Sequence, residues 1–299
     1  MARPQPGIFA QGTRSHYHLE FDLLPGATDA AVVAALHGLR EPPVTAGGSN
    51  IVIGFGPALW RRLQPGDTPA ALGEFVAIEG DGRRAPATPH DLWVWTHGTG
   101  EDVELDVARA AAAALAPVAT LVAEQPCFVY RDSRDLTGFI DGTENPPVEE
   151  AFDVALVPDG EPGAGGAFVL AQKWVHDLAA FDLQSQADQE ATIGRTKPDS
   201  IELDDKPATA HISRVVIEED GEELELYRRS TPYGRVGELG LYFLAFSADP
   251  TRFTKMLRRM FDADGEGVHD HLVDFSTPVS GACYFAPSLD ALDGLLPSV

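Results

Sequence analysis

Strand-like and helix-like segments follow the same order twice along this chain, and that order constrains the fold more than any other feature. In the first part, the expected elements are a strand, a helix, two strands and an alanine-rich helix, at residues 17–23, 27–39, 50–55, 92–96 and 103–121. A β, α, β, β, α order is typical of an α+β unit in which helices pack on one face of an antiparallel sheet.

The second part repeats this scheme with longer insertions. Strands are expected at residues 127–130, 167–175, 241–246 and 281–285, with a basic helix at 251–261. The Asp220-Gly221 pair predicts the turn of a hairpin formed by residues 211–218 and 223–229. Residues 138–166 form a long connection rich in Gly and Pro, and connections of that length inside a compact domain are usually functional.

The length of 299 residues fits two compact units. The repeat predicts α+β architecture with two ferredoxin-like halves, in which antiparallel sheets carry peripheral helices in a barrel-like arrangement. We place the boundary near residues 124–126, so that residues 1–124 form the N-terminal half and residues 125–299 the C-terminal half.

The excess of acidic residues indicates which kinds of partner the protein can bind. With 46 acidic and 22 basic residues, the formal net charge is -24, and the resulting field repels nucleic acids. The N-terminus lacks the apolar segment of a secretory signal, and no run approaches the roughly 20 apolar residues of a membrane span. We therefore expect a cytoplasmic protein without a membrane or nucleic-acid partner. Cys127 and Cys283 are expected to be buried, reduced thiols.

One loop stands out chemically, because Gly and Pro bracket a single acidic group among apolar residues. It reads Gly138-Phe139-Ile140-Asp141-Gly142 and continues through Thr143 to Pro146. Such a loop can hold Asp141 in a dry pocket, where the carboxylate would have a raised pKa and could shuttle a proton. Taken alone, the loop is more typical of an Asp-Gly turn whose carboxylate is solvated.

Further segments decide between these interpretations. The loop resembles the GxxDG signature of dye-decolourising peroxidases, and four more segments resemble that family in order: residues 210–214, 228–234, 237–240 and 274–277. The resemblance covers roughly residues 5–288 and is closest to the compact, bacterial B-type group. It implies a haem peroxidase that reduces hydrogen peroxide to water through a ferryl intermediate while oxidising organic donors such as dyes or phenols.

The resemblance also assigns roles. His211 matches the haem iron ligand, and Asp274 the carboxylate expected to accept the other N–H of that imidazole. Asp141 and Arg228 match the distal acid and arginine that act on peroxide, and Ser230 stands where several relatives have Asn. The residues expected to contact haem are His211, Asp141, Gly142, Thr143, Arg228 and Asp274, while Asp141, Arg228 and Ser230 are the expected catalytic residues.

Other residues carry weaker hypotheses. His176 and Arg195 are candidates for the edge of the haem or for a propionate. His16 with His18, and His269 with His271, are spaced to share a face in extended chain, which raises a non-haem metal site as an unfavoured alternative. Most Trp and Tyr residues are expected in the core, although Tyr227 or Tyr242 could relay electrons to bulky donors.

The resemblance implies one haem b per chain, in the C-terminal half, and a homo-oligomer. Some relatives are packaged by an encapsulating shell protein through a C-terminal extension, but residues 295–299 give no clear cargo tail. Two alternatives remain. One is a haem-handling protein that stores or delivers the cofactor, or releases its iron, with peroxidase activity as a side effect. The other is a haem-free α+β barrel that binds a small molecule or metal.

Overall fold

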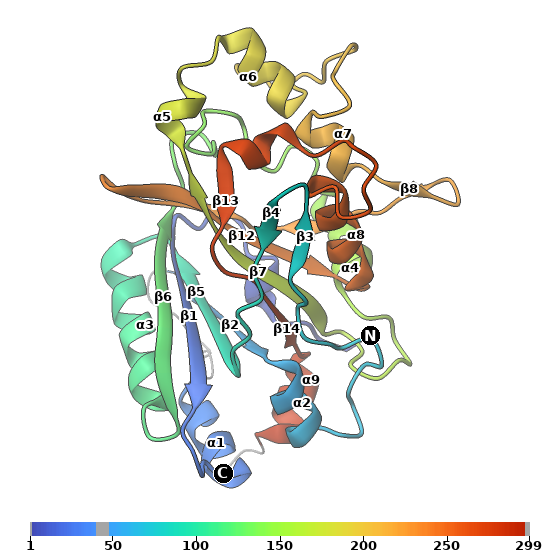
Figure 1. Cartoon of the computed structure of the whole chain (residues 1–299). Coiled ribbons are helices and arrows are strands. Elements are labelled where there is room, and N and C mark those ends of the chain that lie inside the picture. The colour runs from blue at the N-terminus through green and yellow to red at the C-terminus, as the bar shows by residue number, and fades with distance from the viewer. Residues whose placement is uncertain (1, 40–47, 297–299) are drawn as a thin grey trace.

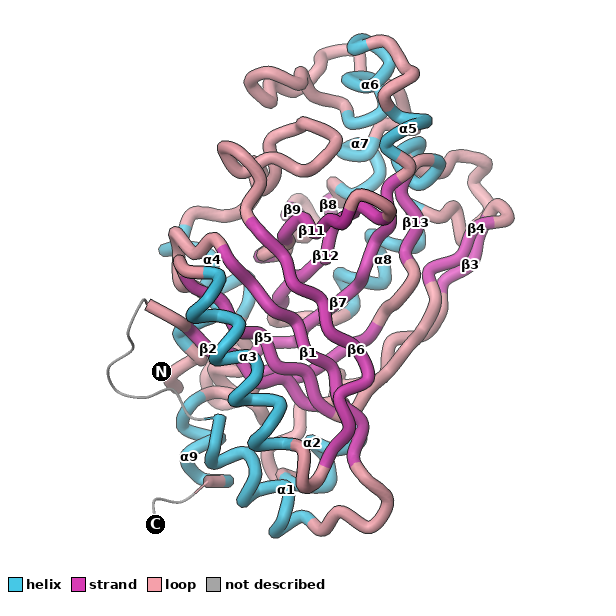
Figure 2. Tube along the Cα trace, turned by 90° about the vertical axis from the view of Figure 1, so that its left-hand side faces the viewer, coloured by secondary structure: helices cyan, strands magenta, loops and turns pink. Residues whose placement is uncertain are grey.

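The computed structural model describes residues 2–39 and 48–296, and its first half has the predicted order of elements. The main elements are β1 (Ser15–Leu23), α1 (Asp29–Leu36), β2 (Asn50–Phe55), β5 (Leu92–Gly98), α3 (Glu101–Leu115) and β6 (Ala119–Phe128). The strands lie side by side in the order β2-β5-β1-β6, with antiparallel neighbours throughout. This is the strand order of a ferredoxin-like unit, with α1 and α3 packed together on one side, as Figures 1 and 2 show.

The second half repeats the arrangement. Its elements are β7 (Ala167–His176), β10 (Tyr227–Arg228), β11 (Thr231–Arg235), β12 (Glu238–Ser247), α8 (Thr251–Met260) and β14 (Ala282–Ala286). The strand order β10-β12-β7-β14 matches that of the first half, and β14 pairs with β2 at Phe285 and Phe55. The main strands of both halves therefore form one sheet, whose strand order runs from β10 to β6 and which is not a closed barrel.

Most of the other helices lie at the two ends of the molecule (Figure 1). One end holds α5 (Leu178–Phe181), α6 (Gln186–Ile193), α7 (His211–Val215) and the 3-10 helix η3 (His271–Asp274). The other end holds α1, α2 (Pro57–Leu63) and α9 (Leu289–Leu295). Shorter pieces are the 3-10 helices η1 (Pro6–Ile8) and η2 (His37–Leu39), α4 (Val148–Ala155), β13 (Ser276–Pro278), and the hairpins β3 (Ile78–Gly80) with β4 (Arg83–Ala85) and β8 (Glu218–Glu219) with β9 (Glu222–Glu223).

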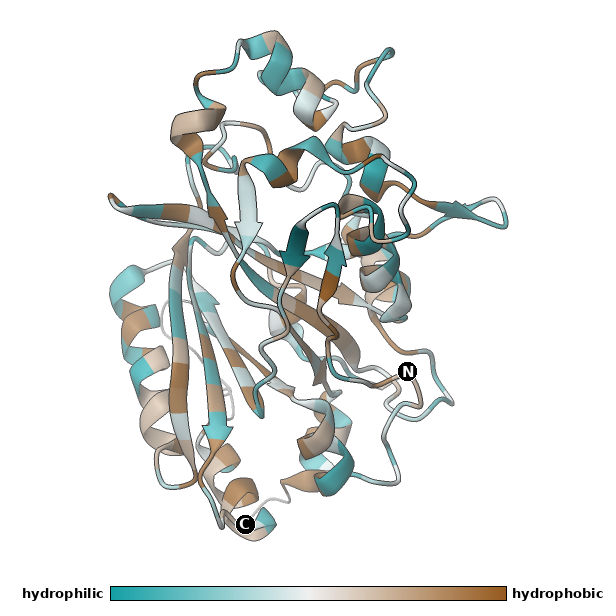
Figure 3. Ribbon diagram, in the orientation of Figure 1, coloured by the Kyte–Doolittle hydropathy of each residue, from teal (hydrophilic) through white to brown (hydrophobic). Residues whose placement is uncertain are grey.

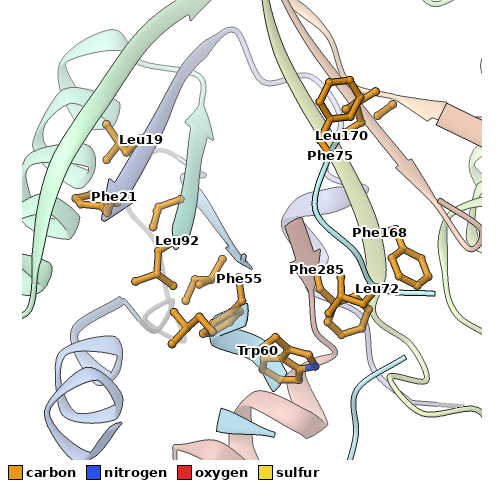
Figure 4. Close-up of a cluster of buried hydrophobic side chains, with 14 of the residues drawn as sticks. Leu19, Phe21, Phe55, Trp60, Leu72, Phe75, Leu92, Phe168, Leu170 and Phe285 are labelled. Carbon is orange, nitrogen blue, oxygen red and sulfur yellow. The ribbon is translucent and has the colours of Figure 1, made fainter. Parts of the chain in front are cut away.

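Alternation along β1 divides its side chains between two cores. Leu19 and Phe21 face the larger core, which Figure 4 shows with Phe55, Trp60 and Leu92. His18 and Glu20, which alternate with them along the strand, are also buried but lie on the opposite face, toward the second half. The first-half sheet is therefore covered on both sides, which explains why polar residues of a strand are found in the interior.

Several predicted elements are confirmed, and others differ from the prediction. Residues 119–121, expected at the end of a helix, belong to β6, because α3 ends at Leu115, before the proline at 117. Residues 211–215, expected as a strand, form the helical turn α7, in which the Arg214 N–H donates to the carbonyl of Ala210 (3.2 Å). A short apolar run cannot be told from a strand by periodicity alone. The hairpin around Asp220 forms, but it is shorter than predicted and hydrophilic (Figure 3).

The long connection at residues 138–166 also contains more structure than predicted, since α4 lies within it. Cys127 and Cys283 are both free thiols, buried and partly buried respectively, as expected. Among the described residues, none of the helices combines the length and apolar character needed to cross a membrane. The last three residues of the expected tail region, 297–299, lie outside the described part.

Candidate active site

A single cavity collects most of the predicted site residues. It is bounded by β7, β12, α7, α8 and the loop of Asp141, and it encloses about 1520 Å³ of space, part of which is open to solvent. Apolar side chains from β7, β12 and α8 form much of its wall, including Leu170, Phe243 and Leu257. Of the predicted residues, those that line the cavity are Asp141, Gly142, Thr143, His211, Arg228 and Ser230.

His211 begins the short helix α7, and a buried carboxylate orients its ring. Nδ1 lies 2.6 Å from Oδ2 of Asp270, which is completely buried. Since an ionised carboxylate only accepts, the ring proton belongs on Nδ1, and the lone pair of Nε2 is left available to a ligand. The other oxygen of Asp270 accepts the N–H of Leu272 (2.9 Å) and so caps η3.

The prediction for Asp274 is therefore wrong. Asp274 does not line the cavity, and its carboxylate instead contacts Arg83 and His269 (3.2 Å for His269). The physical reason is that Asp274 is the last residue of η3, whereas Asp270 precedes its first turn and faces α7. The pattern of residues 274–277 indicated the correct segment but not the correct carboxylate.

Asp141 is held by its loop and is poised to bind a proton. Its N–H donates to the carbonyl of Ser133 (3.0 Å), and Gly142 follows with φ +77°, a conformation that favours glycine. Burial raises the pKa of Asp141, and the nearby carboxylate of Asp135 acts in the same direction. The positive charge of Arg228 opposes this rise, so the two predicted catalytic groups interact electrostatically.

Arg228 lies on β10, and Asn145 fixes its backbone to the Asp141 loop. Asn145 Oδ1 accepts the N–H of Arg228 (2.8 Å), and Nδ2 donates to the carbonyl of Arg228 (2.7 Å). The hydroxyl of Ser230 accepts the N–H of Leu244 (3.3 Å), which ties that side chain to β12. Sequence reasoning missed Asn145, because an Asn directly before Pro is also typical of an ordinary turn.

Two more polar residues complete the cavity wall. Arg195 donates to the carbonyl of Ser200 (2.6 Å) and pairs with Glu144, but its buried Nε has no partner among the described residues. The ring of His176 lies between Ser276 (2.8 Å) and Asp135 (3.1 Å). Although burial acts to raise it, the pKa of Asp135 is lowered by hydrogen bonds from His176 and Thr137.

A second, polar cavity meets the first at the predicted catalytic residues. Both cavities are lined by Asp141, Gly142, Arg228 and Ser230. The second is bordered by polar residues such as Thr13 and Ser133, whereas the first is largely apolar. The acid and the guanidinium thus lie where a small polar molecule and a large apolar one could both reach them.

The alternative metal sites are not formed in the described part of the chain. No group of three or more His, Cys, Asp or Glu side chains there is arranged to hold a metal ion. His16 and His18 do share a face, as predicted, but both stack against Trp95. His269 pairs with Asp81 (2.9 Å) and Asp274.

Comparison with known proteins identifies the family. The chain matches the family models "Dyp-type peroxidase, N-terminal" over residues 5–128 and "Dyp-type peroxidase, C-terminal" over residues 132–291. It is 38% identical to a dye-decolorizing peroxidase of Rhodococcus erythropolis, over 98% of this chain and 89% of the relative. It is 40% identical to a dye-decolorizing peroxidase of Mycobacterium tuberculosis, over 86% of this chain and 77% of the relative.

Solved structures give the same result. DyPB from Rhodococcus jostii RHA1 superposes with a TM-score of 0.89 at 36% identity, over 98% of this chain and 99% of that one. A variant of that protein in complex with heme has a TM-score of 0.90 at 36% identity, over 98% and 100% of the two chains. The family models together cover most of the chain, and both relatives match it over most of their length. This chain belongs to the Dyp-type, or dye-decolourising, peroxidase family.

Proposed function

We propose that this protein is a haem-dependent peroxidase that reduces hydrogen peroxide to water and oxidises organic donors such as dyes or phenols. One observation carries the proposal: a single cavity brings together His211, oriented by a buried carboxylate, and the interacting pair of Asp141 and Arg228. This supports His211 as the iron ligand and Asp141, Arg228 and Ser230 as the residues that act on peroxide.

The cavity fits haem b in three respects. Its apolar walls suit a porphyrin, and the Nε2 lone pair of His211 suits iron. The buried Nε of Arg195, without a partner among the residues described, suits a propionate. Asp141, Gly142, Thr143 and Arg228 would also contact the cofactor. When bound, haem supplies the electrons that split the O–O bond and then accepts single electrons from the donor.

The residues of the chain carry out the proton chemistry. Asp141 would accept a proton from one oxygen of the peroxide, and its raised pKa would allow it to hold that proton and pass it to the other, leaving oxygen. Arg228 stabilises the negative charge that develops on the peroxide. Asp270 stabilises positive charge on the His211 imidazole, which makes the ring a stronger electron donor.

The haem-handling alternative is less favoured. A carrier needs an apolar cavity and an axial ligand, but it gains nothing from a partly buried carboxyl group that interacts with a guanidinium. Removing charged groups from water costs free energy, and binding haem alone does not require these two groups. The haem-free alternative does not explain why Asp141 and Arg228 face one cavity, or why the buried Nε of Arg195 has no partner among the described residues.

Several finer assignments belong to the same proposal. We place haem in the C-terminal half, one per chain, and divide the chain into residues 1–124 and 125–299. A cytoplasmic location and a homo-oligomeric assembly stay predictions, as do the physiological donor and any association with a shell protein.

The test is stopped-flow absorbance of the haem-loaded protein mixed with one equivalent of peroxide. The Soret band of the parent should change rapidly, and Arg228→Ala should slow the change at least about tenfold, which corresponds to about 1.4 kcal/mol in barrier. Asp141→Ala should also slow it, and His211→Ala should lose the axial ligand signature. A Soret band that does not respond to peroxide in the parent would favour the carrier.

A further inference from the structure

A column of aromatic rings fills the interior between the two halves, on the other face of the sheet from the first, apolar cavity. One of its members, His16, also lines the second, polar cavity. The column is built from alternate residues of β1, β5, β12 and β14, namely His16, His18, Trp93, Trp95, His97, Tyr242 and Tyr284. Each of these side chains is at most 3% exposed. Rings so completely buried cannot contact a bulky donor directly, which excludes them as surface oxidation sites.

The rings are close enough to form an unbroken series. His18 lies at its centre, with ring centroids 3.9 Å from Tyr242, 6.0 Å from Trp93 and 5.9 Å from Trp95. Trp93 continues to Tyr284 at 6.0 Å. Tyr and Trp are the side chains most readily oxidised by one electron, so the series offers several neighbouring places where an electron could be removed.

A buried carboxylate joins the two tyrosines of this column. The hydroxyl of Tyr242 donates to Oε1 of Glu20 (3.1 Å), and the hydroxyl of Tyr284 donates to Oε2 (2.7 Å). Glu20 is 5% exposed, and burial raises its pKa, so it takes up a proton more readily than a solvated glutamate. Burial also raises the pKa of both phenols, which therefore keep their protons at rest.

Packing alone does not account for this arrangement. An apolar core gains nothing from a carboxylate between two phenols, and burying that charge is unfavourable. Oxidation of a buried tyrosine does need a nearby carboxylate or other base. A phenol that loses an electron becomes strongly acidic and must give its proton to a base within hydrogen-bond distance.

Of the two tyrosines in the column, Tyr242 is the one whose chain neighbours line the apolar cavity. It lies on β12 between Leu241 and Phe243, both of which line the cavity, while its own side chain points to the opposite face. Only the thickness of the sheet separates its ring from the cavity. The two neighbours are apolar, so electron transfer across the sheet would not be accompanied by proton transfer along the same route.

We propose that Tyr242, with Glu20 as its proton acceptor, is a radical site of this enzyme, which rests on the peroxidase function proposed above. Tyr242 gives one electron to the cofactor that peroxide has oxidised, and its phenolic proton moves to Oε1 of Glu20. The products are a neutral tyrosyl radical and a protonated Glu20. An electron from an organic donor later reduces the radical, and the proton returns from Glu20. The site stores one oxidising equivalent away from solvent when no donor is bound.

The experiment is freeze-quench electron paramagnetic resonance of the haem-loaded protein after one equivalent of peroxide, without donor. A tyrosyl signal is expected that narrows when the protein contains ring-deuterated tyrosine. Tyr242→Phe should reduce this signal at least fivefold, whereas Tyr284→Phe and the control Tyr17→Phe should retain most of it. Tyr17 is buried on β1 but belongs to the other core. Glu20→Gln should lower the yield with Tyr242 in place.

The unsubstituted protein provides a second measurement that does not depend on the folding of a variant. Electron-nuclear double resonance should show a proton hydrogen-bonded to the radical oxygen, and this proton should exchange in D2O. A tyrosyl signal that survives Tyr242→Phe, or a radical without such a proton, would overturn the inference. A Soret band that does not respond to peroxide would instead refute the peroxidase function, so the two failures are distinguishable.

Discussion

The side-chain amide of Asn145 binds the backbone of Arg228 at both its N–H (2.8 Å) and its carbonyl (2.7 Å). This pair of hydrogen bonds connects the loop of Asp141 to β10, so it sets the position of the guanidinium relative to the carboxyl group. We expect Asn145→Ala to slow the peroxide-dependent Soret change about tenfold while haem retention stays the same, since small displacements of a charge-stabilising group are costly. Stopped-flow absorbance and haem transfer to apomyoglobin measure the two quantities.

Asn50 provides the matched control. Its side-chain amide makes two hydrogen bonds to the backbone as well, to the carbonyls of Gly48 (3.0 Å) and His97 (3.1 Å), but Asn50 lines neither cavity. Asn50→Ala should leave the peroxide reaction unchanged. Equal rates for the parent and Asn145→Ala would show that Arg228 does not depend on this clamp.

The carboxylate of Asp270 should govern the electronic character of His211. Asp270→Asn replaces the carboxylate beside Nδ1 of His211 by a neutral amide, which makes the imidazole a weaker electron donor. We expect haem to dissociate 10-fold to 100-fold faster and the midpoint potential of the iron to rise. Spectroelectrochemistry and haem transfer report these changes.

Asp274→Asn is the comparison that separates the two acids of this segment. Asp274 contacts Arg83 and His269 and does not line the cavity, so its variant should keep the potential and the haem dissociation rate within about twofold of the parent. The assignment of Asp270 would be refuted if the two variants showed the reverse effects.

Arg195 should contribute to haem affinity through a propionate. Its Nε is buried and has no partner in the described part of the chain, although its other nitrogens bind Ser200 and Glu144. Arg195→Gln should weaken haem binding about tenfold, because charge-assisted hydrogen bonds are among the stronger ones. Binding of haem dimethyl ester, which lacks the carboxylates, should change little.

Lys206→Gln tests whether the loss of any positive charge near Arg195 would weaken haem binding. Lys206 pairs with Glu202 (2.5 Å), the same acid that approaches Arg195, but Lys206 does not line the cavity. This variant should bind haem and its dimethyl ester as the parent does. If Arg195→Gln weakened the ester as strongly as haem, Arg195 would act on the fold rather than on a propionate.

The sequence predicted the halves, most strands and the loop of Asp141, because these depend on local patterns. Alternation along residues 17–23 and the Asp220-Gly221 turn are properties of neighbouring residues. The GxxDG loop combines Gly, Asp and an apolar flank within five positions. These local patterns can be recognised in the sequence without knowing how the elements pack together.

The partners of the site residues were not predictable in this way. Asp270 and Asp274 lie four residues apart and are chemically identical, and only the packing of η3 against α7 decides which one meets His211. The contact between Asn145 and Arg228 joins positions 83 residues apart. Likewise, the polar residues of β1 gave no sign that both faces of the strand would be buried.

The last prediction concerns pH and the fold rather than catalysis. Glu104, on the first turn of α3, is completely buried and accepts a hydrogen bond from Ser49 (3.1 Å). Burial raises its pKa from 4.5 to about 7, so between these values the folded protein keeps a proton that the unfolded chain releases. Stability therefore falls as the pH rises through this window.

Glu104→Gln removes the titration and should flatten this part of the pH dependence. Relative to the parent, the variant should gain about 2–3 kcal/mol in free energy of unfolding between pH 5 and pH 8, at about 1.4 kcal/mol per pH unit. Denaturant titration at both pH values gives the difference, and Glu101→Gln, an exposed change on the same turn, should give none. The same stability difference at pH 5 and pH 8 would mean that Glu104 stays ionised in the fold, and the buried charge would then need a closer partner than the hydroxyl of Ser49.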